Sequence, residues 1–569
     1  MSRLLLRTLR DAPADAEAVS HQLLVRAGYI RRHASGIYTW LPLGWRLLQR
    51  VETIIREEMD RAGAQEMLMP VLQSVDLWES TGRLATMEDI LFRLHGKGGD
   101  FVLGPTHEEV VTATVANEVD SYRDLPLNVY QIQLKYRDEA RPRFGLLRGR
   151  EFVMKDAYSF DASPAGMQES YQAMYDAYIR IFERCGVQPT PVVADSGAIG
   201  GEVNHEFMVP SAIGEDMFVR CPKGDYAANL EAATAGDPWF DDPSVRHGRR
   251  QRPDEPLTEH HTPDRPGIDL VVDFFTNEGR PLTAAGMLKC IALVDESDNP
   301  VVALVPGDRE VRVPKGHRTF DDSDFERNPH LVKGYIGPMG LQSHGVRVVA
   351  DPLVKAPATW VTGANKADHH VTGATLHRDF EVDAWLPLAT VAPNDPCPRC
   401  GNPLTLVRSV EAGHTFQLGL TYSLKMGATF GDEDGKERPF WMGCYGIGVS
   451  RLPAVVAEEH HDDHGLAWPA DVAPFSVHLL AIGAARNPEV ATAADALYDQ
   501  LTGAGIAVLY DDRPDVSPGV KFADADLLGM PTQLVVGAKG LARGVVERKD
   551  RATGGRDELP VNAVVATFN

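Results

Sequence analysis

The sequence predicts a protein of mixed helices and strands divided into several domains, and three observations lead to this fold class. First, a chain of 569 residues is too long for one hydrophobic core and predicts three or four domains. Second, strand-like and helix-like segments alternate after Pro474, which indicates a small doubly wound domain. Third, apolar residues recur with the spacing of an amphipathic helix just before Gly63: Leu47, Leu48, Val51, Ile54, Ile55 and Met59.

Composition and charge exclude several classes of protein. The chain is 43% hydrophobic and 24% charged, a balance typical of folded proteins in water. Its 57 Lys and Arg against 80 Asp and Glu give a net charge of −23, which excludes an overall basic nucleic-acid-binding protein but not a local basic surface. No uncharged apolar stretch reaches the length of a membrane span, and six cysteines are too few for a disulfide framework. We therefore expect a cytosolic protein with neither a DNA nor a membrane partner.

The elements can be predicted in chain order. Ser163 and Pro164 predict the start of a second amphipathic helix, because a capping residue precedes a first-turn proline. Residues 237–266 hold six prolines and are predicted to form neither helix nor strand. The remaining expected strands cover 268–275, 290–294, 301–305, 346–350, 476–482, 507–510 and 533–536, and the remaining helices 452–457, 488–501 and 521–528.

The densest group of candidate functional residues lies in the segment 135–155. It holds seven Lys or Arg against three acids, inside an acidic protein. Apolar flanks predict a hairpin whose loop is rich in arginine, and guanidinium groups match phosphate oxygens bidentately. Phe152 adds an aromatic face for a base. A solvated basic loop with no ligand explains the charge run equally well.

Two further segments are less informative when each is taken alone. The segment 443–451 is glycine-rich and places Arg451 at a strand-to-helix turn, where it could point into a cleft or form a surface ion pair. The segment 66–70 predicts an apolar strand that runs into Pro70. The Walker A loop, the G-x-G-x-x-G turn and the H-E-x-x-H zinc helix do not occur in the sequence.

Taken together and in this order, the three segments resemble motifs 1, 2 and 3 of the class II aminoacyl-tRNA synthetases. Further matches, which extend over nearly the whole chain, resemble the prolyl-tRNA synthetases of bacterial type. They are residues 27–44, Leu103–Glu109, Tyr136–Glu139, His414–Gly419, Met442–Arg451 and Pro518–Asp526.

The resemblance implies an α+β fold with four parts. Residues 1–220 and 405–470 would form the class II antiparallel sheet with flanking helices. Residues 221–404 would be an inserted α/β editing domain, and residues 474–569 an α/β anticodon-binding domain. The implied partners are ATP with Mg²⁺, L-proline and tRNA(Pro), and motif 1 implies a homodimer.

The resemblance also assigns roles in the catalytic site. Arg137 would hold the α-phosphate of ATP, Glu139 the adenine amino group and Arg148 the terminal phosphate. Phe152 and Arg451 would lie on opposite faces of the adenine, and Gln417 would touch ATP or the adenylate. Adenylate formation needs positioning and neutralisation of negative charge rather than a protein nucleophile. Arg137 and Arg451 are therefore the expected catalytic residues.

Around the amino acid, Thr106 and Glu108 would meet the proline nitrogen, and Arg137 would lie close to both substrates. His414, Phe416 and Cys444 would line the pocket. As alternatives, His414 could be a hydrogen-bonded core histidine, and Cys444 a small buried apolar residue.

In the insertion, three residues resemble those of an editing site that deacylates alanyl-tRNA. They are Lys289, Asp351 and His370, the last chosen over His369 by counting from Gly363. An editing site is physically sensible, because a proline pocket rejects a smaller residue by only about 1–3 kcal/mol. Lys289 could instead be a charge at a strand edge and His370 a surface residue.

Two observations concern metals and tRNA. Cys397 and Cys400 form a C-x-x-C pair, but the corresponding pair at Cys221 has Gly224 in the second position. Three thiolates do not close a structural zinc site, so we expect no bound zinc unless Asp225 or a histidine completes it. Residues 539–556 carry six Lys or Arg against two acids, which suits a face that contacts phosphates.

Three rival functions remain to be compared. A threonyl- or seryl-like synthetase would share the three motifs, but the Thr-His-Glu segment at 106–108 and the insertion argue against it. A synthetase-derived tRNA-binding regulator without aminoacylation would be expected to lose motif arginines, yet Arg137, Arg148 and Arg451 are all present. The same intact ATP site argues against a protein that only deacylates.

Overall fold

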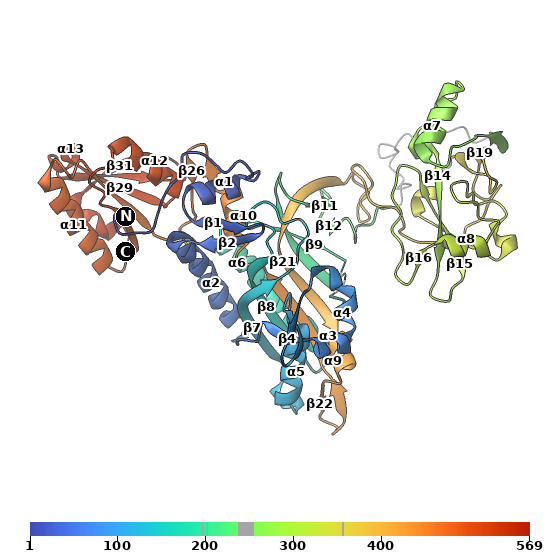
Figure 1. Ribbon diagram of the computed structural model, residues 1–569, viewed down its shortest axis with the longest axis horizontal. Coiled ribbons are helices and arrows are strands. Elements are labelled where there is room, and N and C mark those ends of the chain that lie inside the picture. The colour runs from blue at the N-terminus through green and yellow to red at the C-terminus, as the bar shows by residue number, and fades with distance from the viewer. Residues whose placement is uncertain (196, 198, 202, 237–254, 356–357, 569) are drawn as a thin grey trace. The chain divides into compact units, whose positions relative to one another are not determined.

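The computed structural model describes residues 1–195, 197, 199–201, 203–236, 255–355 and 358–568 (Figure 1). The chain forms two compact units. Unit 1 comprises residues 1–191, 196–216 and 408–569, and unit 2 comprises residues 192–195 and 217–407. The four-part division suggested by the sequence stays a prediction.

Unit 1 is built around an antiparallel sheet. Its strands follow the order β10 (Val203–Pro210), β21 (Thr405–Gly419), β24 (Trp441–Ile447), β8 (Glu151–Asp161) and β7 (Leu127–Tyr136). The short strand β3 (Gln65–Glu66) adds to β7 in parallel. The predicted arginine hairpin is therefore confirmed as β7 and β8. The strand predicted over 66–70 is much shorter than expected, because only its first residue belongs to β3.

Helices cover both faces of this sheet. The helices α2 (Pro42–Arg61) and α6 (Pro164–Arg184) pack on the face that carries Ala157 and Tyr445, and α5 (Glu108–Glu118) and α9 (Thr421–Met426) on the face that carries Tyr158 and Cys444. Alternation along β8 and β24 explains this division, since neighbouring residues point to opposite faces.

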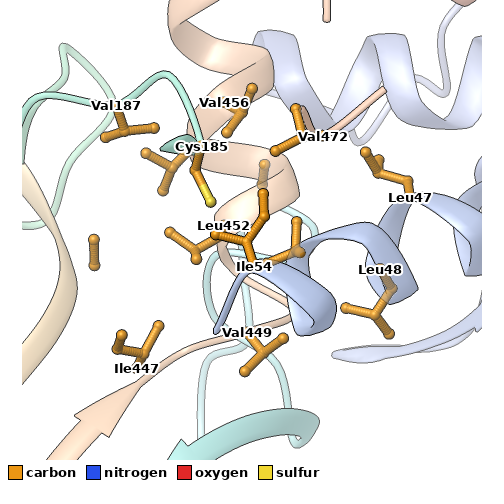
Figure 2. Close-up of a cluster of buried hydrophobic side chains, with 14 of the residues drawn as sticks. Leu47, Leu48, Ile54, Cys185, Val187, Ile447, Val449, Leu452, Val456 and Val472 are labelled. Carbon is orange, nitrogen blue, oxygen red and sulfur yellow. The ribbon is translucent and has the colours of Figure 1, made fainter. Parts of the chain in front are cut away.

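Both predicted helix boundaries are confirmed. The hydroxyl of Ser163 accepts a hydrogen bond from the backbone N–H of Gly166, and Pro164 starts α6. The helix α2 ends at Arg61, and Gly63 adopts a left-handed φ of 79° just beyond it. Figure 2 shows the apolar cluster in which side chains of α2, β24 and α10 (Leu452–Glu459) meet.

The C-terminal part of unit 1 contains a mixed five-stranded sheet. Its parallel strands are β28 (Val508–Asp511), β27 (Val477–Ile482) and β29 (Thr532–Gly537), and the hairpin β30 (Val545–Asp550) and β31 (Arg556–Pro560) extends it antiparallel. The helices α11 (Pro488–Gly503) and α12 (Pro518–Leu528) connect the parallel strands. The predicted alternation is confirmed, and the hairpin is an addition to it.

Unit 2 contains a five-stranded and a three-stranded sheet. The first has the order β16 (Arg318–Thr319), β14 (Leu288–Val294), β15 (Pro300–Pro306), β17 (Arg347–Ala350) and β20 (Ala384–Trp385). The second has the order β13 (Thr258–His261), β19 (His369–Ala374) and β18 (Trp360–Gly363). The strands expected over 290–294, 301–305 and 346–350 are thus confirmed.

Two predictions for unit 2 are wrong. Residues 268–275 form a helix, α7 (Ile268–Asn277), rather than a strand, because Val271 and Phe275 are buried one turn apart while Asp269 and Asp273 are exposed. The segment 237–266 contains β13, since the stretch between Pro256 and Pro263 is free of proline and pairs along β19 as an edge strand. Residues 237–254 of that segment lie outside the described residues.

Within the described part of the chain, no helix combines the length and the apolar character that crossing a membrane would need.

Candidate active site

A buried cluster of polar side chains lies where α5 begins in unit 1. Glu108, the first residue of α5, is completely buried. Its Oε2 accepts hydrogen bonds from the Thr106 hydroxyl at 2.7 Å and from the Arg83 guanidinium at 3.0 Å. Its Oε1 accepts a bond from the Cys444 thiol at 3.2 Å. The predicted trio of Thr106, Glu108 and Cys444 therefore meets at one carboxylate.

Electrostatics keep this carboxylate ionised. Burial alone would raise the pKa of Glu108, but the charge of Arg83 and the hydrogen bond from Thr106 outweigh it and lower the pKa. The adjacent Glu109 shares the same arginine, at 3.0 Å from Arg83, and burial raises its pKa. The two neighbouring carboxyl groups are thus driven in opposite directions.

Two aromatic rings of β21 lie beside this polar cluster. His414 and Phe416 stack with ring centroids 3.8 Å apart, and Phe416 lies opposite Cys444 in the register of β21 and β24. Nε2 of His414 lies 2.8 Å from Oδ1 of Asn204, and Nδ1 lies 3.1 Å from Oε1 of Glu411. His414 is therefore held in place on both sides of its ring.

A cavity of about 250 Å³ in unit 1 adjoins Glu411. Its lining includes Glu139, Arg148, Glu411 and Arg451. Burial would raise the pKa of Glu411, but the hydrogen bond with His414 and the charges of Arg451 and Arg137 lower it to about 2. Glu411 thus contacts His414 of the polar cluster through a hydrogen bond and Arg451 of the cavity lining at 3.6 Å.

Two arginines, Arg148 of the hairpin and Arg451, line this cavity, and the hairpin also carries Arg137. Arg148 donates to Glu139 at 2.7 Å and to Glu215 at 2.6 Å. The Arg137 guanidinium lies 5.2 Å from the centre of the Phe152 ring, and its buried Nε has no hydrogen-bond partner. Nε of Arg451 donates to the Leu147 carbonyl at 3.0 Å. The site therefore holds a cationic group beside an aromatic face, with one donor unsatisfied.

The structure does not bring Gln417 to this cavity or to the polar cluster at Glu108. Its amide donates to Gln168 of α6 at 2.8 Å, on the face of the sheet opposite His414 and Phe416. The alternation of β21 explains this placement, because residue 417 points away from residues 414 and 416.

Next to Thr106 and Glu108, a buried hydrogen-bond network holds the turn that precedes α5. Nζ of Lys135 lies 2.6 Å from Nδ1 of His107 and 2.8 Å from Asp156, and Nε2 of His107 lies 3.1 Å from the Pro70 carbonyl. Burial and the charge of Lys135 lower the pKa of His107 to about 4. His107 is therefore neutral at pH 7 and positions Thr106 and Glu108 from below.

Sequence reasoning did not identify Arg83, His107 or Glu411. Glu411 lies three residues before His414, an odd spacing that normally turns two strand residues to opposite faces. A bulge at Ala412, where β21 slips one residue against β10, returns Glu411 to the same face. Arg83 lies in the short helix α4 (Arg83–Thr86), where its sequence gives no sign that it is buried.

Unit 2 has its own cavity, of about 630 Å³. It is lined by α7, β14 and β19, and its lining includes Lys289 and His370. Burial lowers the pKa of His370 to about 4, and Nδ1 of His370 lies 2.6 Å from the Thr262 hydroxyl. Nζ of Lys289 donates to Glu310 at 3.1 Å.

Asp351 does not line this cavity. Its buried carboxylate accepts backbone hydrogen bonds from Leu353, Leu388 and Ala389 at 2.7–2.9 Å. These bonds fix the connection after β17, which gives Asp351 a structural position. The predicted trio is therefore reduced to Lys289 and His370.

Among the residues that the structure describes, two groups of side chains could hold a cation. Donor atoms of Glu206, Glu411 and His414 lie within 4.8 Å of one another, as do the sulfurs of Cys221, Cys397 and Cys400. The proposed completion of the cysteine cluster by Asp225 does not occur, because Asp225 pairs with Arg399 at 2.7 Å.

Most of the basic segment 539–556 is paired. Arg548, Lys549 and Arg551 contact carboxylates at 2.5–2.7 Å, and Arg543 pairs with Glu558. The charge run seen in the sequence therefore overstates the charge that this segment can offer to a phosphate backbone.

Comparisons with known proteins show the family to which the chain belongs. Residues 92–460 match the family described as tRNA synthetase class II core domain (G, H, P, S and T), and residues 472–569 match the family described as anticodon binding domain. The proline--tRNA ligase of Corynebacterium diphtheriae is 47% identical over 100% of this chain and 99% of its own length. That of Nocardioides sp. is 49% identical over 99% and 98%.

Solved structures show the same fold. A Giardia lamblia prolyl-tRNA synthetase in complex with prolyl-adenylate has a TM-score of 0.57 at 14% identity, over 96% of this chain and 75% of its own. A Cryptosporidium parvum prolyl-tRNA synthetase complexed with halofuginone and AMPPNP gives 0.57 at 13%, with the same coverage. Since the curated relatives match the whole chain at nearly half identity, this chain belongs to the proline--tRNA ligases, a family of class II aminoacyl-tRNA synthetases.

Proposed function

We propose that this chain joins L-proline to tRNA(Pro) in two steps, through a prolyl-adenylate, at the polar cluster around Glu108 and at the cavity of unit 1 beside Glu411. The observation that carries the proposal is the ionised, fully buried Glu108, with Thr106 and Cys444 directed at it and an arginine-lined cavity close by. Arg83 is shared between Glu108 and Glu109, so a further cation beside Glu108 would be stabilised by the charge that this one arginine leaves uncompensated. Proline supplies such a cation as its secondary ammonium group.

Proline would lie between Glu108 and the stacked rings of His414 and Phe416. The ring of proline is apolar and its nitrogen is charged, so the site must offer a flat apolar wall and one anion. Phe416, His414 and Glu108 provide these two features, and the small Cys444 leaves room beside them. This arrangement supports the proline-binding roles predicted from the sequence.

ATP would lie in the cavity that Glu139, Arg148 and Arg451 line. Arg137 offers its unpartnered Nε to the α-phosphate, and Arg148 offers its fork to the terminal phosphate when it leaves Glu139 and Glu215. The adenine would stack between Phe152 and Arg451, with Glu139 accepting a bond from its amino group. Attack of the proline carboxylate on the α-phosphorus then depends on the positions of these cations.

Magnesium fits the acidic group of this site. Glu206 and Glu411 offer carboxylate oxygens, the ligands that Mg²⁺ prefers, within 4.8 Å of each other. When bound, Mg²⁺ would neutralise phosphate charge. Glu411 also contacts His414 and Arg451, so one carboxylate would position these two side chains and the metal ion.

Exchange of pyrophosphate into ATP tests the activation step. With proline, alanine, cysteine and threonine in parallel, we expect the strongest exchange with proline and a weaker exchange with alanine. A folded protein that binds ATP but exchanges with none of these amino acids would contradict the proposal and favour a tRNA-binding regulator.

For the cavity of unit 2 we propose hydrolytic editing of alanyl-tRNA(Pro). Lys289 would meet the phosphates at the tRNA end, and the neutral His370 would take part in positioning water or the ester. Asp351 is left out of this role because its carboxylate is bound to backbone N–H groups. Deacylation of alanyl-tRNA(Pro) by the isolated protein is the test, and equal stability of the ester with and without the protein would contradict it.

The homodimer, the cytosolic location and the binding of tRNA(Pro) through residues 474–569 stay predictions. The match of residues 472–569 to an anticodon-binding family supports the last of these.

A further inference from the structure

Three thiols meet in unit 2 at the two ends of the insertion. The Sγ atoms of Cys221, Cys397 and Cys400 lie within 4.8 Å of one another, and those of Cys221 and Cys400 are 3.4 Å apart. A disulfide requires about 2.05 Å, so these sulfurs are not bonded. Four sulfurs around a zinc ion with Zn–S bonds of about 2.3 Å are separated by about 3.8 Å, which is close to the spacing seen here.

The turn that carries two of these cysteines is shaped to stabilise sulfur anions. The backbone N–H of Arg399 points to Sγ of Cys397 at 3.4 Å, and the side-chain amide of Asn402 points to Sγ of Cys400 at 3.2 Å. The N–H of Cys397 donates to the Asn402 carbonyl at 2.8 Å, and Gly401 adopts a φ of 71°, which closes the turn. Donors directed at ligand atoms are a regular feature of metal sites.

Gly224 marks the fourth position. A Cβ built on Gly224 would lie 3.4 Å from Sγ of Cys221 and 3.7 Å from Sγ of Cys400, so a side chain there would point into the cluster. Within the described residues the cluster contains three thiols and no fourth protein ligand. Cys400 is exposed while Cys221 and Cys397 are buried, so the cluster opens to solvent on one side.

We propose that Cys221, Cys397 and Cys400 form an open three-thiolate site for a thiophilic divalent cation of the zinc type, with a water molecule in the fourth position. Three thiol protons are released as three metal–sulfur bonds form. The site differs from a closed structural zinc site in having an exchangeable ligand.

Such a cation would cross-link the start and the end of the insertion. The local core combines small residues, among them Ala228 and Ala233, with Val219, Val391 and Leu404, and the metal would add a cross-link to this packing. A cross-link between residues 221 and 397 restricts a long loop of the unfolded chain, which favours the folded state. We therefore expect the metal to slow hydrogen exchange in residues 221–226 and 396–402.

Titration of the full-length, fully reduced protein with Zn²⁺ against a chromophoric chelator tests the proposal. The expected result is one equivalent bound per chain by the unmodified protein and an affinity at least tenfold weaker for Cys400→Ser. Cys185→Ala, which removes a thiol buried in unit 1, serves as the matched control and should bind as the unmodified protein does. Co²⁺ should give thiolate charge-transfer bands that Cys400→Ser weakens.

A second pair of variants tests the geometry without removing a ligand. Gly224→Cys should bind Zn²⁺ at least tenfold more tightly than the unmodified protein, and Gly224→Ala should not. The proposal is overturned if the unmodified protein binds no more Zn²⁺ than Cys400→Ser, or if Gly224→Cys binds no more tightly than Gly224→Ala.

Discussion

At the scale of single residues, the proposed proline pocket depends on how two adjacent buried carboxyl groups share one arginine. Arg83 contacts both Glu108 and Glu109 at 3.0 Å, and it also lies over the rings of Trp78 and Tyr422. Glu108 has two further donors, whereas Glu109 has the Thr81 hydroxyl. This difference favours the negative charge on Glu108, the carboxylate that would face the substrate in the proposed function.

Removal of Arg83 should make proline recognition dependent on pH. In Arg83→Met, burial and the charge of Glu109 are no longer opposed, so the pKa of Glu108 rises and the carboxyl group becomes neutral as the pH falls. We expect kcat/KM for proline to fall about tenfold or more between about pH 8 and 6, while the unmodified protein changes little. The measurement is pyrophosphate exchange at a series of pH values.

Arg83→Lys is the matched control, because it keeps the positive charge and should restore most of the flat profile. The KM for ATP should stay within about twofold in both variants, since Arg83 does not line the proposed ATP cavity beside Arg148 and Arg451. A uniform loss of activity at every pH, equal in the two variants, would contradict the positioning role and indicate a folding defect.

The buried His370 leads to a different pH prediction. Since burial lowers its pKa to about 4, His370 is neutral at and above pH 6, and deacylation of alanyl-tRNA should lose rate only below about pH 5. An acid limb near the ordinary value of 6.5 would contradict this. The same shift means that unit 2 loses stability as the pH falls from 6.5 towards 4, because the unfolded chain takes up the proton first.

Residue types and spacing predicted part of the site. Thr106, Glu108, His414, Phe416 and Cys444 do meet, because their motifs lie on adjacent elements of one sheet face. Glu411 could not be found, since the bulge at Ala412 has no sequence signature. Gln417 and Asp351 were included by motif, but their hydrogen bonds direct them elsewhere.

At the scale of elements, local signals were reliable where they acted alone. The cap at Ser163 and the glycine after α2 fixed helix ends, and alternation fixed the strands of the C-terminal sheet. The helix α7 was mistaken for a strand because a run of Ile, Leu, Val and Phe favours both structures. The two aspartates one turn apart, Asp269 and Asp273, were the signal for a helix.

The cap of α6 can be tested separately from catalysis. Ser163→Ala removes the acceptor of the Gly166 N–H and should lower the free energy of opening of the first turn by about 1 kcal/mol. Ser163→Asp keeps an acceptor and should exchange its amide protons at close to the original rate. The measurement is amide hydrogen exchange in the first turn of α6, and equal exchange in all three proteins would refute the capping role.

At the scale of the whole molecule, two separate cavities in two compact units imply two separable activities. His370→Ala should reduce deacylation of alanyl-tRNA(Pro) by at least tenfold and leave proline-dependent pyrophosphate exchange unchanged. Lys289→Ala should behave in the same way, mainly through weaker binding of the tRNA end. Equal loss of both activities in either variant would show that the two functions are not divided between the units.

Proline-dependent pyrophosphate exchange by Glu108→Gln, beside the unmodified protein, tests the central claim most directly. The substitution keeps the size of the side chain and removes the charge that would pair with the proline nitrogen. We expect kcat/KM for proline to fall by about 100-fold, which corresponds to about 2.7 kcal/mol, while the KM for ATP stays within about twofold. An unchanged kcat/KM for proline in a folded Glu108→Gln protein would contradict the assignment of this pocket.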